Sequence, residues 1–279
     1  MIAYQGHEGA YSHLACKQVF PDKEAMACET FIDAMRAVEQ GKATLAMIPV
    51  ENSTAGRVEE IYRLIPKMKL HIVGEHYEPV NHCLLAPRGS TMDSIKTVAS
   101  HPQALAQCAT HIEQFNLRPL AKLDTAGAAK EVAQLADTSK AAIASSLAAE
   151  LYGLTTLQEN FQDISGNTTR FIVLSHTQDL PALQPGSEYI TSIIFKVRNI
   201  PAALYKALGG FATNNINLLK LESYMPHGTL SASQFHVDIQ AHPAERRVQL
   251  ALDELGFFAD DIRLLGTYLA HPFRKTIAF

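Results

Sequence analysis

The chain has 279 residues, of which 47% are apolar and 19% are charged, so its length and composition predict about two domains with packed cores. Its formal net charge is −4 without a long basic run, which argues against nucleic acid as a partner. The four cysteines form no CxxC pair, and no apolar run reaches the ~18 residues needed to span a membrane. We therefore expect a cytoplasmic protein without a signal peptide, disulfide framework, zinc ribbon or membrane partner.

Short apolar stretches alternate with helix-like stretches over the first 175 residues. The expected strands cover residues 2–5, 45–50, 70–73, 82–86, 95–99, 119–123, 141–144 and 170–174. The expected helices cover residues 13–19, 30–41, 57–65, 126–136 and 145–151, and a further helix opens at Pro102. Thr30 with Asp33 makes a capping-box-like start, Gly41 ends that helix, and Thr125 is expected to cap the helix at 126–136. This alternation predicts an α/β sheet covered on both faces.

Three of the expected strand-to-helix junctions carry small polar or hydrogen-bonding residues. These residues are Tyr11 and Ser12; Asn52, Ser53 and Thr54; and Ser100, His101 and Gln103. Such residues commonly cap helices. The alternative is that they bind an anion together with the positive end of the helix dipole.

A fourth polar cluster runs from Ser165 to Phe171 and leads into an apolar β-branched run that is typical of a buried strand. Polar groups at the mouth of a buried strand are where α/β proteins hold small anions. Arg170 offers a planar fork of donors for a carboxylate, and Thr169 offers a rotatable hydroxyl. The simpler alternative is a turn that caps the strand, with Arg170 solvated.

A metal site is conceivable around Glu75, His76, Glu78 and His82. The spacing of these residues matches neither HExxH nor HxxxH. Scattered surface histidines are therefore the preferred interpretation, and no metal or other cofactor is expected.

Residues 176–188 lack periodicity and contain two prolines and a glycine, which predicts a linker. After it, expected strands at 189–197, 216–224, 230–240 and 262–269 and helices at 201–213 and 243–255 follow the ferredoxin-like βαββαβ order. Gly209 and Gly210 weaken the first of these helices by about 1 kcal/mol each. We expect a close helix–sheet contact to compensate.

Four motifs in order resemble those of single-activity bacterial prephenate dehydratases. They are Tyr4-Gln5-Gly6 with Gly9-Ala10-Tyr11-Ser12; Ile48-Pro49-Val50-Glu51-Asn52-Ser53 with Gly56; Ser100-His101-Pro102-Gln103-Ala104-Leu105; and Asn167 with Thr169-Arg170-Phe171. The resemblance implies a two-lobed catalytic domain similar to the periplasmic-binding type at 1–175, the linker at 176–188, and an ACT regulatory domain at 189–279. Because only Met1 precedes Ile2, the chorismate mutase domain of bifunctional members is expected to be absent.

The family's activity is the conversion of prephenate to phenylpyruvate in L-phenylalanine biosynthesis, a carbon–oxygen lyase reaction that needs no cofactor. Carried over residue by residue, the resemblance makes Thr169 the donor to the leaving hydroxyl. The residues expected to bind substrate are Tyr11, Ser12, Asn52, Ser53, Thr54, Ser100, His101, Gln103, Arg170 and Phe171. Arg170 can instead hold the lobes together. His101 is the histidine considered as an acid near neutral pH, with helix capping as an equal alternative.

The regulatory half departs from the family pattern at two places. Pro-Gly-Ala-Leu is replaced by Pro201-Ala202-Ala203-Leu204, and Glu-Ser-Arg-Pro by Glu222-Ser223-Tyr224-Met225. A Cβ at Ala202 can crowd a ligand, and the missing arginine removes a charged contact. L-Phenylalanine feedback is still expected, through effector residues Ala202, Ala203, Leu204, Leu221, Glu222 and Ser223. The resemblance also implies a homodimer or homotetramer.

Two alternatives stay open. The enzyme can act on arogenate, which differs from prephenate at the side-chain keto or amino group. The chain can also be a non-catalytic sensor of a small anion. Such a sensor needs the carboxylate clamp but not a hydroxyl aimed at the ring oxygen, so Thr169 separates the two classes.

Overall fold

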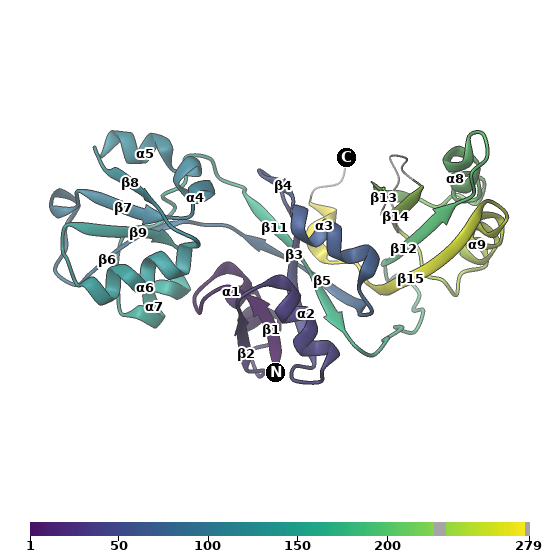
Figure 1. The fold of residues 1–279 in the computed structure, drawn as a ribbon, viewed down its shortest axis with the longest axis horizontal. Helices are drawn as coiled ribbons and strands as arrows, with labels where there is room; N and C mark the ends of the chain where they lie inside the picture. Colours follow the sequence, from purple (N-terminus) through teal and green to yellow (C-terminus); the bar gives the residue numbers. More distant parts are fainter. Residues whose placement is uncertain (226–232, 277–279) are drawn as a thin grey trace. The chain divides into compact units, whose positions relative to one another are not determined.

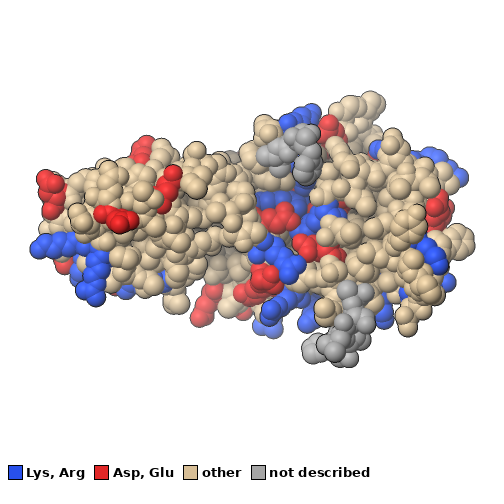
Figure 2. Space-filling model, turned by 90° about the horizontal axis from the view of Figure 1, so that it is seen from above, with Lys and Arg blue, Asp and Glu red and all other residues tan. Residues whose placement is uncertain are grey.

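The computed structural model describes residues 1–225 and 233–276 (Figure 1). The chain divides into two compact units, one made of Met1–Ile65 with His76–Phe171 and the other of Pro66–Glu75 with Ile172–Phe279. No helix in the described part of the chain is long and apolar enough to cross a membrane. On the face drawn in Figure 2, basic and acidic side chains are interspersed.

The first sheet has the strand order β2-β1-β3-β11-β5, with β4 added to β3. Its strands are β1 Ile2–Gln5, β2 Ala25–Cys28, β3 Leu45–Asn52, β4 Gly56–Arg57, β5 His71–Pro79 and β11 Thr168–Ser175. The accompanying helices are α1 Tyr11–Val19, α2 Phe31–Glu39 and α3 Glu59–Leu64, which the 3-10 turn η1 Ile65–Lys67 follows. β1 pairs in parallel with both β2 and β3, and Ile2, Met47 and Ile48 are fully buried.

A second sheet, which lies within the first of the two units, has the order β10-β6-β9-β7-β8. Its strands are β6 Cys83–Ala86, β7 Thr97–Ser100, β8 Arg118–Ala121, β9 Lys140–Ala144 and β10 Thr155–Gln158, preceded at β7 by the 3-10 turn η2 Met92–Ser94. Its helices are α4 Pro102–Gln107, α5 Ala109–Gln114, α6 Thr125–Leu135 and α7 Ser146–Tyr152. α4 and α5 lie on one face of this sheet and α6 and α7 on the other (Figure 1), and each pair of helices packs on an apolar cluster of its own. This sheet is therefore covered on both faces, as predicted.

The C-terminal part of the chain folds as β12 Tyr189–Val197, α8 Ala203–Thr213, β13 Leu218–Tyr224, β14 Gln234–Ile239, α9 Arg246–Phe258 and β15 Ala259–Leu269, followed by the 3-10 turn η3 Pro272–Lys275. The strand order is β13-β14-β12-β15, and every pair is antiparallel. This confirms the ferredoxin-like prediction. The first part of the strand predicted from Leu230 lies outside the described residues.

Several local predictions need correction. β11 begins at Thr168, so Thr168 and Thr169 lie in the strand rather than before it. Asp124, not Thr125, caps α6, because its carboxylate accepts the N–H of Gly127 at 2.6 Å. The strands β2, β4 and β10 were not predicted, since each is short and has no strong alternating pattern.

Gly210 in α8 serves a helix–helix contact rather than the predicted helix–sheet contact, whereas an added Cβ on Gly209 would meet nothing within 4 Å. A Cβ on Gly210 would lie 2.9 Å from Glu254 Cβ and 3.0 Å from the Ala251 carbonyl oxygen, both on α9. Gly210 therefore lets the two helices approach closely (Figure 1).

No helix or strand forms over residues 176–188. The hydroxyl of Tyr189 donates to the Ala182 carbonyl at 2.8 Å and accepts the Gln184 N–H at 3.0 Å. The ring of His242 also contacts the Pro181 carbonyl at 2.8 Å. This irregular stretch is thus held against the ferredoxin-like fold by side chains.

Candidate active site

Asn52 ends β3 and turns the chain into β4. Its side-chain oxygen accepts the N–H groups of Thr54 at 3.0 Å and Ala55 at 2.9 Å. The predicted helix start at this point is therefore wrong: Asn52, Ser53 and Thr54 stand in a hairpin turn, and α3 begins later, at Glu59. Asn side chains favour this local bonding to the following backbone, which gives them a place in turns as well as at helix caps.

The backbone contacts fix which way the Asn52 amide faces. Its Nδ2 donates to Asn167 Oδ1 at 2.7 Å and to Thr169 Oγ1 at 3.0 Å. Because Thr169 Oγ1 accepts this hydrogen bond, the hydroxyl proton of Thr169 is available for a further acceptor. The structure thus brings together two of the predicted site residues, Asn52 and Thr169, which are 117 positions apart.

We call the part of the catalytic region built on the first sheet the first lobe and the part built on the second sheet the second lobe. The network continues into the second lobe through Gln107, a residue that was not predicted from the sequence. Asn167 Nδ2 donates to Gln107 Oε1 at 3.2 Å. Gln107 Nε2 is buried and has no hydrogen-bond partner among the described residues. An unpaired buried donor is costly, and a ligand oxygen would satisfy it. Gln107 lies one helical turn after the predicted Gln103, and that spacing was the available signal.

His82 extends the same network and is 2% exposed. Its Nε2 lies 2.9 Å from Gln107 Oε1, and its Nδ1 lies 2.8 Å from the Tyr11 hydroxyl oxygen. Burial lowers the pKa of His82, although the hydrogen bond to Gln107 acts in the opposite direction. Burial likewise raises the pKa of Tyr11 well above its usual value, and nearby Cys83 and Cys108 add to this shift. Both groups are thus held neutral near pH 7.

Ser53 anchors the start of β11. Its N–H donates to the Thr168 carbonyl at 2.9 Å, and its hydroxyl oxygen accepts the Thr168 N–H, also at 2.9 Å. These paired bonds place Thr169 beside the Asn52 turn. The side chain of Thr54 is exposed.

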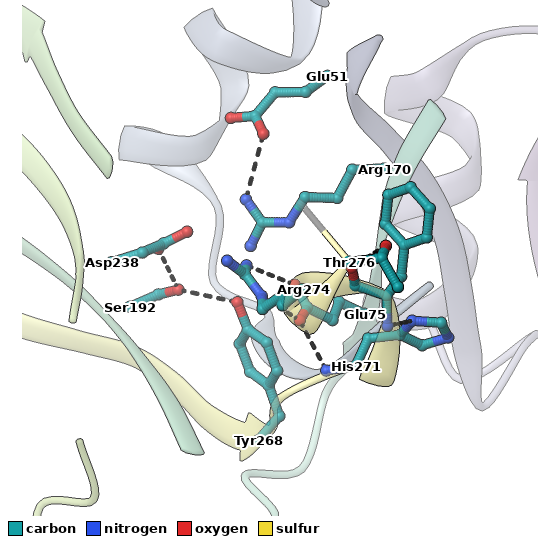
Figure 3. A network of polar contacts seen from close by, with 10 residues as sticks. Glu51, Glu75, Arg170, Ser192, Asp238, Tyr268, His271, Arg274 and Thr276 are labelled. Carbon is teal, nitrogen blue, oxygen red and sulfur yellow. Dashed lines mark hydrogen bonds and ion pairs between the residues drawn. The ribbon is translucent and has the colours of Figure 1, made fainter. Parts of the chain in front are cut away.

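Arg170 and Phe171 lie on the strand beyond Thr169 and are buried. An Arg170 guanidinium nitrogen lies 3.4 Å from Glu51 Oε2, as drawn in Figure 3. Phe171 is 1% exposed within the core. The carboxylate of Glu51 therefore already neutralises part of the Arg170 charge, while Phe171 packs as a structural residue of the strand does.

The residues predicted around α4 do not join the network of Asn52 and Thr169. The hydroxyl of Ser100 is fully buried and donates to the Ile143 carbonyl at 2.6 Å. His101 caps α4 through its Nδ1, which accepts the Gln103 N–H at 3.2 Å. Gln103 is exposed, and Ser12 is buried in α1. The position on α4 that reaches the network is Gln107.

Glu75, His76, Glu78 and His82, the residues of the conceivable metal site, each have other partners. The Glu75 carboxylate accepts hydrogen bonds from Nε and Nη2 of Arg274 at 2.6 and 2.7 Å, as Figure 3 shows. His76 pairs with Glu78 at 3.0 Å, whereas His82 belongs to the network described above. The expectation of surface histidines is wrong for His76 and His82, because β5 and the chain after it run through the interior. Over residues 1–225 and 233–276, no three His, Cys, Asp or Glu side chains are grouped to hold a metal.

The loop before α1 is fastened to the second lobe by three polar contacts. Ser145 donates to the Gly9 carbonyl at 2.5 Å, and Tyr152 donates to the Glu8 carbonyl at 2.6 Å. His7 Nδ1 lies 2.7 Å from Asp124 Oδ2. Tyr11 is the first residue of the helix that follows, so these contacts help to set its position.

The expected effector residues occupy two places in the ferredoxin-like fold. Ala202 caps α8 with a left-handed backbone, φ +56°, and Ala203 and Leu204 form the first turn. Leu221, Glu222 and Ser223 lie on the edge strand β13, where Leu221 is 45% exposed and Glu222 lies 4.0 Å from Lys220.

Comparison with known proteins assigns the chain to a family. Residues 2–179 match the prephenate dehydratase family model. The chain belongs to the prephenate dehydratase family. It is therefore an enzyme of the dehydratase lyase class.

Relatives of this family align over almost the whole chain. A protein of Komagataeibacter europaeus named bifunctional N-acyl-homoserine lactone acylase/prephenate dehydratase is 46% identical over 276 residues, covering 99% of this chain and 98% of that protein. Arogenate dehydratase 2 of Petunia hybrida is 40% identical over 289 residues, covering 96% and 71% respectively.

Two solved structures have the same fold as this chain. The prephenate dehydratase of Arthrobacter aurescens in complex with L-Phe is 29% identical, has a TM-score of 0.87, and covers 96% of this chain and 89% of that one. A structure described as GqqA, a novel type of quorum quenching acylase, is 47% identical, has a TM-score of 0.91, and covers 98% and 99%.

Proposed function

We propose that the chain converts prephenate to phenylpyruvate and that Thr169 donates a hydrogen bond to the departing hydroxyl. The observation that carries the proposal is the direction of the bond from Asn52 Nδ2 to Thr169 Oγ1 at 3.0 Å. Because the threonine oxygen is the acceptor there, its proton is directed elsewhere, and a substrate hydroxyl can receive it.

The reaction needs such a donor because hydroxide is a poor leaving group. The ring C–O bond breaks as water leaves, and the bond to the ring carboxylate breaks to release carbon dioxide. The electron pair of that C–C bond enters the ring, which becomes aromatic. One proton is needed to convert the departing hydroxide to water, and solvent supplies it while Thr169 holds the hydroxide by a hydrogen bond.

Threonine is too weak an acid to ionise, so its contribution is a positioned hydrogen bond rather than full proton transfer. Gln107 Nε2 supplies a second donor, since it has no partner among the described residues. Ser53, Thr54 and Arg170 are proposed to bind the substrate carboxylates from the first lobe. Asn52 is proposed to act at the substrate site by orienting Thr169, because both its amide hydrogens are already bonded. Tyr11, Ser12, Ser100, His101, Gln103 and Phe171 stay proposed contributors to the same pocket.

The first experiment is a turnover assay with purified full-length protein on prephenate and on arogenate, each with and without L-phenylalanine. Phenylpyruvate from prephenate, detected by its ultraviolet absorbance in alkali, supports the proposal. If phenylalanine forms from arogenate and no product forms from prephenate, arogenate is the substrate, in line with the names of the plant relatives. If neither substrate gives a product, the interpretation of the chain as a non-catalytic sensor of a small anion is favoured.

A second candidate activity is hydrolysis of the amide bond of N-acyl-homoserine lactones. The 46% identity to the bifunctional acylase over 98% of its length favours testing it. Incubation with an acyl-homoserine lactone and detection of the released homoserine lactone decides the matter. Comparison of the Thr169→Ala variant in both assays would show whether the two activities share a site.

We also propose that residues 189–279 form an ACT domain that binds L-phenylalanine, joined by the linker 176–188 to the catalytic domain 1–175. The ferredoxin-like strand order and the L-Phe complex of the Arthrobacter relative support this. Ala202, Ala203, Leu204, Leu221, Glu222 and Ser223 are the proposed effector residues. A cytoplasmic homodimer or homotetramer is the proposed state, and light scattering of the purified protein tests its size.

A further inference from the structure

The hydrogen bonds of the candidate site share one direction, which is set at Asn52. Its oxygen is held by the N–H groups of Thr54 and Ala55, so its Nδ2 must be the group that donates to Asn167 Oδ1. Asn167 Nδ2 then faces Gln107 and donates to its Oε1. The orientation of each amide in the series follows from the one before it.

This direction fixes the tautomer of His82. Gln107 Oε1 is an acceptor, so the His82 Nε2 that lies 2.9 Å from it must carry a hydrogen. A neutral imidazole has a single N–H, and Nδ1 is then an acceptor. The Tyr11 hydroxyl has one proton and two acceptors at 2.8 Å, this Nδ1 and the Asn81 carbonyl, so the two acceptors share the proton. If His82 were protonated on both nitrogens, Nδ1 would donate to the Tyr11 oxygen and the hydroxyl proton would go to the Asn81 carbonyl alone.

The backbone of His82 is held as firmly as its ring. Its N–H donates to Gln162 Oε1 at 2.8 Å, and its carbonyl accepts the Phe161 N–H at 2.7 Å. The residue stands just before β6, where the chain enters the second lobe, and Tyr11 comes from the first lobe. The imidazole thus joins a side chain of one lobe to Gln107 of the other.

We infer that His82 is a positioning residue for the dehydration: in its Nε2–H form it holds the Gln107 carboxamide oxygen, so that the amide N–H groups of Gln107 are presented to substrate. The inference rests on the proposed function for its catalytic consequence. The histidine itself touches Gln107 and Tyr11 rather than the reacting atoms. Gln107 contributes the donor, and its two acceptor contacts, from His82 and Asn167, keep it from turning over.

Paired substitutions test this role. In His82→Gln an amide nitrogen can reach the place of the imidazole Nε2 and donate to Gln107, whereas His82→Leu fills the space without a donor. We expect His82→Leu to lower kcat by about 10- to 100-fold, the scale of a misplaced donor, with KM changed by less than about 3-fold. His82→Gln should recover most of the loss. Equal loss in both variants at equal thermal stability would overturn the inference.

His242→Leu is the matched control. His242 is 1% exposed, and both its ring nitrogens are bonded, to the Pro181 carbonyl and to the Ala244 N–H, but it lies in the other unit. Assayed without phenylalanine, this variant should keep its kcat while losing stability as His82→Leu does. If His242→Leu lost as much kcat as His82→Leu, the loss in His82→Leu would be explained by lower stability, and the inference would be overturned.

The tautomer is measured independently of turnover. Full-length protein labelled with ¹⁵N-histidine, with the His82 signal assigned by its absence in His82→Gln, should show a protonated Nε2 and a bare Nδ1 near pH 7. A protonated Nδ1 with a bare Nε2 would overturn the inference whatever the enzyme's activity. If wild-type protein turned over neither substrate, the proposed function would fail while this spectrum still decided the tautomer.

Discussion

Asn52 keeps its side-chain oxygen against the N–H groups of Thr54 and Ala55 and thereby sends its amide hydrogens to Asn167 and Thr169. At the scale of single residues, the chemistry of the site depends on this choice between oxygen and nitrogen. An amide accepts hydrogen bonds at its oxygen and donates two from its nitrogen, whereas a carboxylate has no hydrogen to donate and a hydroxyl has one. Two residue-scale predictions follow from it.

Thr169→Ala should lower turnover by at least ~100-fold, the scale of losing a positioned donor in the transition state. Thr169→Ser should retain more activity, because it keeps the hydroxyl. Steady-state kinetics on the preferred substrate measures both. Thr168→Ala is the control, since Thr168 is the adjacent strand residue on the opposite face and its hydroxyl bonds the Gly166 carbonyl at 3.3 Å. Near-normal turnover of Thr169→Ala would remove Thr169 from the mechanism.

Asn52→Asp should also lower turnover by at least ~100-fold, the scale of losing one oriented donor. The carboxylate still accepts the Thr54 and Ala55 N–H groups, so the turn is kept. It cannot donate to Thr169, and instead attracts the hydroxyl proton away from substrate. Kinetics together with circular dichroism separate this loss from misfolding. Full activity with a native spectrum would contradict the proposed direction of the network.

At the scale of elements, the loop before α1 and the first turn of α8 are the places where backbone conformation matters most. Gly9 has φ +86°, and a Cβ there would lie 2.9 Å from Ala148 Cα on α7. Ala202, in contrast, is a residue with a Cβ that the fold holds at φ +56°. The first position requires glycine, and the second would be less strained with it.

Gly9→Ala should reduce the free energy of unfolding by about 2–4 kcal/mol, because a left-handed backbone and overlap with α7 both penalise the methyl group. Gly41→Ala is the matched control. Gly41 also has a positive φ, +71°, but nothing lies within 4 Å of its added Cβ, so about 1 kcal/mol is expected there. Urea unfolding measures both. Equal losses would show that the contact between Gly9 and Ala148 is unimportant.

Ala202→Gly should stabilise the protein by roughly 0.5–1 kcal/mol, because it relieves the left-handed strain at the α8 cap. It should also tighten L-phenylalanine binding in calorimetry, since the Cβ at this cap is removed. Ala136→Gly, at the C-cap of α6 with φ +49°, is the control. It should bring similar stabilisation without changing phenylalanine binding. No phenylalanine binding by any of these proteins would remove the proposed effector site.

At the scale of the whole molecule, one buried and one half-buried histidine link folding to pH. Burial lowers the pKa of His82 and of His13, and Lys17 adds to the effect at His13. The unfolded chain takes up protons on these residues near pH 6.5, whereas the native protein takes them up only at lower pH. Protonation therefore favours the unfolded state.

The free energy of unfolding should accordingly be fully developed above about pH 6.5 and should fall as the pH drops toward the native pKa values. Urea unfolding at pH 7.5 and pH 5.5 measures this decline. His82→Gln should make it shallower, because one of the two groups is gone. A slope unchanged by that substitution would show that His82 does not contribute.

The sequence alone determined much of this protein. The α/β alternation, the βαββαβ order, the cap at Thr30, the helix start at Pro102 and the motif around Thr169 were readable from the sequence, because each depends on neighbours in the chain. The family motifs placed Asn52 and Thr169 in one site, but they did not predict the hydrogen bond between them. Predicted bounds failed mainly where short strands such as β2 and β10 lack a pattern of their own.

Only the tertiary structure shows which residues form the hydrogen-bond network. Gln107 and His82 are 25 positions apart, and Asn52 and Asn167 are 115 apart, so no local pattern marks them as partners. The turn at Asn52 is a hairpin because β4 pairs with β3, and Gly210 in α8 is needed because α9 packs closely against it. Direction in a hydrogen-bond network is a property of all its members together, and it exists only once the chain has brought them into contact.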